Sequence, residues 1–156
     1  MIKEKLLISA CLMGDNVKYD GGNNLIEELE ELSKKFEFIP VCPEVMGGMT
    51  IPRMPCEIKS FNPLKIENEF GINMADHFLD GARQTLALAQ QHGVKYALLK
   101  SNSPSCGNKN IYDGTFSGKL IEQSGVTAKF LLDHGIKVYN EDEICPFEIK
   151  FTILWK

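Results

Sequence analysis

Three of the five cysteines in this chain each follow a short apolar run and stand in a loop that contains glycine or proline. These cysteines are Cys11, Cys42 and Cys106, and the preceding runs cover residues 6–10, 38–41 and 96–99. If the runs are neighbouring parallel strands, their carboxyl ends meet at one edge of a sheet, where open α/β folds bind their ligands. Thiols that are distant in the sequence would then lie close together in space.

Soft thiolates are the ligands preferred by iron–sulfur clusters, zinc and copper(I). Three of them leave one coordination position open on a tetrahedral ion or a four-iron cluster, and a substrate can bind at that position. None of the three belongs to a CxxC pair, which argues against zinc-ribbon and thioredoxin-type sites. The spacing indicates a metal centre, and burial of the cysteines as small apolar residues is the alternative.

The neighbours of two of these cysteines strengthen the prediction. Glu44 follows Cys42 after a single proline, in a loop rather than on a charged helix face, and this placement suits an acid or base. Cys106 ends the segment Ser-Pro-Ser-Cys that begins at Ser103, whose hydroxyls and amides could bind an anion or orient a substrate carbonyl. Capping of a turn is the other interpretation of these serines.

The rest of the chain alternates short apolar runs with helical patterns, which is typical of βαβ units. This pattern predicts a three-layer, Rossmann-like α/β domain with a mainly parallel sheet of about four to five strands and helices on both faces. The expected strands cover residues 5–10, 38–42, 96–100 and 136–139, and the expected helices cover 24–36, 76–92 and 126–134. A loop is expected over 43–55 and short extended pieces over 57–65 and 111–116.

Length and charge restrict the remaining possibilities. A chain of 156 residues matches one domain, residues 1–156, and the apolar tail 143–156 is expected to pack on its body or on a partner. A net charge of −4 argues against a nucleic-acid partner and favours a small-molecule substrate. With no secretory signal, no apolar stretch of membrane-spanning length and an odd cysteine count, we expect a cytoplasmic protein with reduced thiols.

Several motifs, read in order, resemble one known family. They are ISACLMG at 8–14 with YDG at 19–21, VCPE at 41–44 with GG at 47–48 and PR at 52–53, SPSCG at 103–107, and IYDGTFSG at 111–118. Together they resemble the thiouracil desulfidase family, which was long catalogued as a domain of unknown function. The resemblance covers residues from about 5 to 142, and its motifs are more specific together than any one of them alone.

The resemblance implies an oxygen-sensitive 4Fe-4S cluster held by Cys11, Cys42 and Cys106, with a fourth iron that binds the sulfur of the substrate. It also implies that Glu44 and Ser103 are catalytic, in the hydrolysis of a thiocarbonyl to a carbonyl and hydrosulfide. A thiolated pyrimidine is the expected substrate, and no membrane partner is expected.

Other residues carry weaker expectations. Arg53 could contact a substrate carbonyl or phosphate, or form a surface salt bridge. Tyr112 and Phe116 could stack on a pyrimidine ring, or simply pack. Cys56 and Cys145 are expected to be structural, although Cys56 could also approach the site as a stray ligand or a disulfide partner.

Two other functions are compatible with the same residues. One is a cluster-bearing sulfur-transfer or sensing module that does not hydrolyse a substrate by itself. The other is a non-catalytic α/β domain that binds zinc. Release of sulfide without a partner would favour the enzyme.

Overall fold

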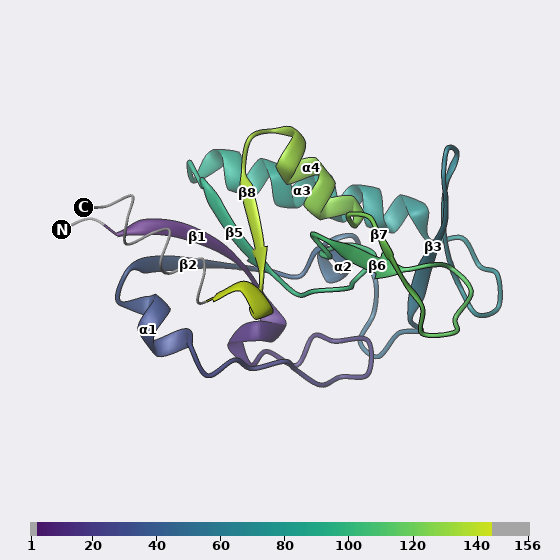
Figure 1. Cartoon of the computed structure of the whole chain (residues 1–156), viewed down its shortest axis with the longest axis horizontal. Helices are drawn as coiled ribbons and strands as arrows, with labels where there is room; N and C mark the ends of the chain where they lie inside the picture. Colours follow the sequence, from purple (N-terminus) through teal and green to yellow (C-terminus); the bar gives the residue numbers. More distant parts are fainter. Residues whose placement is uncertain (1–2, 145–156) are drawn as a thin grey trace.

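A four-stranded parallel sheet lies at the centre of the computed structural model, which describes residues 3–144 (Figure 1). Its strand order is β2-β1-β5-β8, and each neighbouring pair is parallel. The strands are β1 (Glu4–Ser9), β2 (Phe36–Val41), β5 (Tyr96–Leu99) and β8 (Lys137–Asn140). The predicted α/β class, with parallel strands at these places, is confirmed.

Helices cover both faces of the sheet, as predicted (Figure 1). The long helix α3 (Ala75–Gln91) and α4 (Val126–Asp133) pack on one face, and the short helix α1 (Leu29–Ser33) covers the other. The middle residues of β1 are buried on both sides, with Leu7 facing α3 and α4 while Leu6 and Ile8 face α1. A continuous apolar run is what a parallel strand between two helical layers requires.

The register of the sheet aligns the carboxyl ends of its strands. Ser9 at the end of β1 lies opposite Val41 at the end of β2, and Leu99 at the end of β5 lies opposite Asn140. The chain runs outward from β1 to β2 and then returns to β5 on the other side of β1. The strand order therefore reverses beside β1, and such a switch point opens a ligand crevice beyond the strand ends.

Two antiparallel hairpins lie outside the central sheet. One pairs β3 (Cys56–Phe61) with β4 (Leu64–Asn68), where the sequence indicated only one extended piece, and the other pairs β6 (Asn110–Tyr112) with β7 (Leu120–Glu122). Both share a separate apolar cluster with the first turns of α3 and α4, through buried residues such as Ile58, Ile66 and Ile111.

The segment 24–36 is helical over a shorter range than its periodicity predicted. The backbone amides of Asn24 and Ile26 donate to the carbonyls of Cys11 and Leu12, at 2.8 and 3.1 Å. Cys11 and Leu12 belong to η1 (Ala10–Met13), a 3₁₀ turn that directly follows β1. Because these contacts hold the start of the segment against η1, α1 begins only at Leu29.

A second difference lies in the loop predicted over 43–55, which contains the short helix α2 (Pro43–Met46). This helix packs closely on α3, because glycines stand on both sides of the contact. A methyl group on Gly81 of α3 would overlap the carbonyl of Pro43, and one on Gly47 would overlap the carbonyl of His77. His77 of α3 donates from Nδ1 to the carbonyl of Gly47 at 2.7 Å. Helix α3 thus fixes the segment that carries Glu44.

Replacing Gly81 with alanine is expected to destabilise the protein. Helix propensity alone would raise the free energy of unfolding by roughly 1 kcal/mol, but the overlap with the backbone of α2 should lower it by about 1–3 kcal/mol. Urea unfolding measures the net change in the free energy of unfolding. Gln90→Ala, at an exposed position of the same helix, should change the free energy by less than about 0.5 kcal/mol. A stabilised Gly81→Ala protein would contradict the close contact.

Within residues 3–144, no helix combines the length and apolarity needed to cross a membrane. The predicted packing of the tail concerns residues 143–156, of which 145–156, with Cys145, lie outside the described residues.

Candidate functional site

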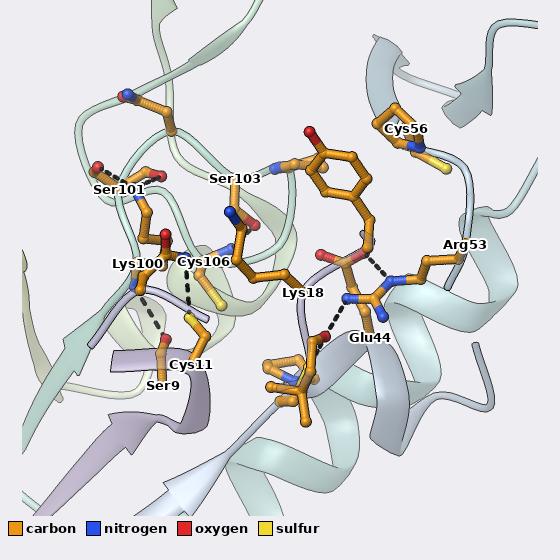
Figure 2. A pocket seen from close by; sticks show the side chains of 18 of the residues that line it. Ser9, Cys11, Lys18, Glu44, Arg53, Cys56, Lys100, Ser101, Ser103 and Cys106 are labelled. Carbon is orange, nitrogen blue, oxygen red and sulfur yellow. Dashed lines mark hydrogen bonds and ion pairs between the residues drawn. The ribbon is translucent and has the colours of Figure 1, made fainter. Parts of the chain in front are cut away.

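A cavity of about 510 Å³ opens at the carboxyl edge of the sheet. Its wall includes residues that follow β1, β2 and β5, together with parts of both hairpins. All the sequence-predicted site residues line it: Cys11, Cys42, Glu44, Arg53, Ser103, Cys106, Tyr112 and Phe116. Figure 2 shows the side chains of Cys11 and Cys106 at one part of the cavity, with Glu44, Arg53 and Cys56 across from them.

Cys11 lies in the 3₁₀ turn directly after β1 and is partly buried. Its Sγ accepts a hydrogen bond from Asn24 Nδ2 at 3.5 Å. Burial raises the pKa of this thiol most, and the charge of Cys42 adds to the rise, while Asn24 and Lys100 act in the opposite direction.

Cys42 is the N-cap residue of α2, with an extended backbone, and is also partly buried. Its Sγ donates to the carbonyl of Val17 at 3.9 Å. Burial raises the pKa of the thiol, and the backbone amide of Val45 and the charge of Arg53 partly offset the rise.

Cys106 is buried, and the turn before it is capped by Ser103. Ser103 Oγ accepts hydrogen bonds from the backbone amides of Ser105 and Cys106, both at 3.0 Å. Cys106 Sγ itself contacts Ser105 Oγ at 3.8 Å. Burial raises the pKa of this thiol strongly, and the charges of Cys42, Glu44 and Cys11 raise it further.

The electrostatics of these three thiols fit a metal group. Each of the two charges that Cys11 and Cys42 would carry as thiolates raises the pKa of Cys106, so the three sulfur atoms lie within electrostatic range of one another. Three thiolates, one buried and two partly buried, need compensating positive charge, and a metal supplies it by displacing the thiol protons. The donor set is therefore suited to a soft, cationic group.

Among residues 3–144, no group of three or more His, Cys, Asp or Glu side chains has the spacing expected around one metal ion.

Glu44 and Arg53 form an ion pair beside the thiols. Arg53 Nε donates to Glu44 Oε1 at 3.1 Å, and both side chains are largely removed from solvent. Burial raises the pKa of the Glu44 carboxyl group, while the charge and hydrogen bond of Arg53 lower it, and the net shift is upward. A buried carboxyl group with a raised pKa is a stronger proton acceptor than an ordinary glutamate side chain.

Sequence reasoning missed a polar network next to Cys11. Lys100 pairs with Glu141 at 2.7 Å, and Glu141 also accepts from the amide and the hydroxyl of Ser101, each at 2.8 Å. The buried hydroxyl of Ser9 accepts from the amide of Lys100 at 3.0 Å. The sequence did hold a signal for this network, because these residues stand at or just beyond the ends of β1, β5 and β8, which meet at the same edge of the sheet.

Three further lining residues, Lys18, Tyr19 and Asn24, belong to the segment after η1. Asn24 begins the segment 24–36 that was predicted to be helical, and its side chain reaches Cys11. Tyr19 belongs to the YDG motif at 19–21, but the motif gave this residue no role, and nothing in the sequence distinguished Lys18 from an ordinary loop residue.

The fourth described cysteine, Cys56, begins β3 and is both part of an apolar cluster and a lining residue of the cavity. The four cysteines within residues 3–144 are all free thiols. Burial raises the pKa of the Cys56 thiol to about 11.

Fold and site together define a class: a Rossmann-like α/β protein with a cluster of thiols at the switch point of its sheet. Residues 6–143 match the family described as 2-thiouracil desulfurase. The chain belongs to this family of enzymes, as the sequence motifs predicted.

Two proteins are similar to this chain over nearly its whole length. An uncharacterized protein of Bacillus subtilis (strain 168), YbbK, is 38% identical over 146 residues, which cover 89% of this chain and 97% of YbbK. Among solved structures, the 4Fe-4S-dependent thiouracil desulfidase TudS is 36% identical, with a TM-score of 0.89 over 97% of this chain and 99% of TudS.

Proposed function

We propose that this protein hydrolyses the thiocarbonyl group of a thiolated pyrimidine, giving the carbonyl compound and hydrosulfide. Water adds to the ring carbon, the carbon–sulfur bond breaks, and no electrons are exchanged with another molecule. The observation that carries the proposal is the gathering of three thiols and Glu44 around one cavity at the strand ends. The similarity to TudS, described as a 4Fe-4S-dependent thiouracil desulfidase, supports the same chemistry.

Cys11, Cys42 and Cys106 are the residues that would hold a 4Fe-4S cluster. When bound, such a cluster supplies a Lewis-acidic iron with one position free of protein ligands, to which a soft thiocarbonyl sulfur can bind. Asn24, Lys100 and the amide of Val45 all lower the pKa of one of these thiols, and so favour the thiolate forms that ligation needs.

Glu44 is the residue we assign to proton transfer. Arg53 holds its Oε1, and among the described contacts its Oε2 accepts no hydrogen bond, so Oε2 is available to a water molecule in the cavity. Glu44 takes a proton from the attacking water and returns it as the carbon–sulfur bond breaks. A positioned proton transfer of this kind contributes on the order of a hundredfold or more to the rate.

Ser103 is suited to donate rather than to accept. A serine hydroxyl has two acceptor lone pairs and one hydrogen, and two backbone amides already use Ser103 Oγ as their acceptor. Its hydrogen is therefore the group it can offer to a substrate oxygen, nitrogen or sulfur. We assign Ser103 to orienting the substrate.

Ser103→Ala should lower kcat/KM by about 10- to 100-fold, the effect of one lost hydrogen bond to the reacting molecule. It should also lower the melting temperature, because the turn before Cys106 loses its cap. Ser103→Thr keeps a hydroxyl and should recover both properties in large part. Steady-state sulfide release and thermal unfolding of the three proteins test this, and an Ala variant with unchanged kcat/KM would remove Ser103 from the mechanism.

Tyr112 and Phe116 line the wall that the second hairpin contributes, and Phe116 is held with a positive φ of 57°. Glu57 accepts hydrogen bonds from the amides of Gly114 and Phe116 at 3.0 and 3.1 Å, and so fixes this loop. A left-handed conformation is unusual for a bulky residue and is found most often at functional positions. We propose that these aromatic rings bound the flat ring of the substrate.

The experiment that tests this function is anaerobic reconstitution of the protein with iron and sulfide, followed by incubation with 2-thiouracil and 4-thiouracil. The proposal requires uracil and an equal amount of hydrosulfide from at least one of them, in the absence of any other protein. Iron-loaded protein that yields sulfide only when a second protein accepts it would favour the sulfur-transfer alternative.

A further inference from the structure

Arg53 is one of the two arginines of the chain, and each nitrogen of its side chain has a protein acceptor. Nε donates to Glu44 Oε1 at 3.1 Å, Nη1 to the Thr50 carbonyl at 3.2 Å and Nη2 to the Val17 carbonyl at 2.9 Å. Only 7% of the side chain is exposed. A planar guanidinium with three separate acceptors is fixed in one orientation, which a flexible ammonium group cannot reproduce.

One of these contacts reaches the loop 15–23, which forms part of the cavity wall through Lys18 and Tyr19. The base of the loop is fixed next to η1, where the amide of Asn24 donates to the Cys11 carbonyl at 2.8 Å. Its far part contacts the opposite wall through Arg53, whose amide donates to the Tyr19 carbonyl at 2.7 Å and whose Nη2 donates to Val17. In Figure 2 a dashed line joins Arg53 to Glu44, and Lys18 of this loop lies on the other side of Glu44.

The Val17 carbonyl also accepts from Cys42 Sγ at 3.9 Å. The guanidinium of Arg53 is the second side-chain donor to this carbonyl, at the shorter distance of 2.9 Å.

We propose that Arg53 is a positioning residue that joins the two walls of the cavity: it orients the carboxylate of Glu44 and holds the loop 15–23 against the segment 50–53. It acts through these groups rather than by binding the substrate, which refines the expectation drawn from the sequence. Its catalytic consequence rests on the proposed function, whereas its effect on the loop does not.

The test compares Arg53→Met, Arg53→Lys and the wild type, with Arg83→Met as the matched control. Arg83 is the other arginine, exposed on α3 and outside the cavity. Amide hydrogen exchange is measured at Val17, Lys18 and Gly21, whose amides are hydrogen-bonded within the loop. Iron content, kcat and KM are measured on the same reconstituted samples, and far-UV circular dichroism checks folding.

Arg53→Met should accelerate exchange of these loop amides by about tenfold or more, as loss of a charge-assisted hydrogen bond implies. It should also lower kcat and raise KM, with iron content unchanged. Arg53→Lys keeps a positive charge beside Glu44 but cannot contact all three acceptors, so kcat should recover in part while loop exchange stays fast. Arg83→Met should match the wild type in every measurement.

Loop exchange within about twofold of the wild type in both Arg53 variants would overturn the proposal. A raised KM with unchanged loop exchange would also overturn it, because it would indicate direct substrate binding by Arg53. Should Arg53→Met fail to fold, Arg53→Lys alone decides between these outcomes. If the wild type releases no sulfide, the proposed function fails, and the exchange data still test the role of Arg53 in the loop.

Discussion

Alanine at Cys11, Cys42 or Cys106 is expected to abolish sulfide release and to prevent stable cluster assembly. Each thiolate would supply one of three protein ligands, and a four-iron cluster that loses one of them leaves two irons without protein ligands. Iron and acid-labile sulfide should fall from near four per chain in the reconstituted wild type to a small fraction of that value. Turnover should fall by about a thousandfold or more, since the proposed chemical step needs the open iron.

Cys56→Ala is the matched control for this series. Cys56 lines the same cavity, is buried and is a free thiol, but it stands across the cavity next to Glu44 and Arg53. We expect the Cys56→Ala protein to keep its iron and its turnover. If iron is retained after substitution of Cys42 and lost after substitution of Cys56, the assignment of the ligands is wrong.

Glu44→Gln is expected to have the second largest effect, a fall in kcat of about 100- to 10,000-fold, because an amide cannot accept the proton of the attacking water. The substitution keeps the shape of the side chain and an oxygen that can still accept from Arg53. Iron content and the absorption spectrum of the reconstituted protein should therefore remain those of the wild type. Initial rates of sulfide release, normalised to iron, measure the effect.

Two variants sharpen the Glu44 test. Glu37→Gln, at an exposed position on β2 outside the cavity, should leave kcat unchanged. Glu44→Asp keeps a carboxylate on a shorter side chain and should fall between Glu44→Gln and the wild type. Equal rates for Glu44→Gln and the wild type would exclude Glu44 as the proton acceptor and would leave water activation to another group.

The parallel sheet was predictable because its signals are local and strong. The apolar runs that became β1 and β5 are buried on both faces, the run in the edge strand β2 is partly buried, and such runs end where glycine, proline or polar residues begin. Once the strands are neighbours, the convergence of Cys11, Cys42 and Cys106 follows from the geometry of any parallel sheet. Their presence around one cavity was therefore within reach of the sequence.

The parts that were not predictable depend on contacts between distant segments. The start of the segment 24–36 is held by hydrogen bonds to the carbonyls of Cys11 and Leu12. The spacing of the apolar residues in this segment gives no sign of these long-range contacts. The second strand of the first hairpin, β4, and the fixed position of α2 depend on packing against α3. The Lys100–Glu141 pair depends on the pairing of β5 with β8, and nothing local in the sequence marks these two charged side chains as partners.

Mössbauer spectroscopy of the protein reconstituted with isotopically enriched iron, with and without thiouracil, tests most directly whether three cysteines hold a cluster with one open iron. Three cysteine ligands predict a cluster in which one iron differs from the other three, and in which only the signal of that iron shifts when the thiolated base is added. A spectrum with four equivalent irons, or one that thiouracil leaves unchanged while the protein still releases sulfide, would contradict it.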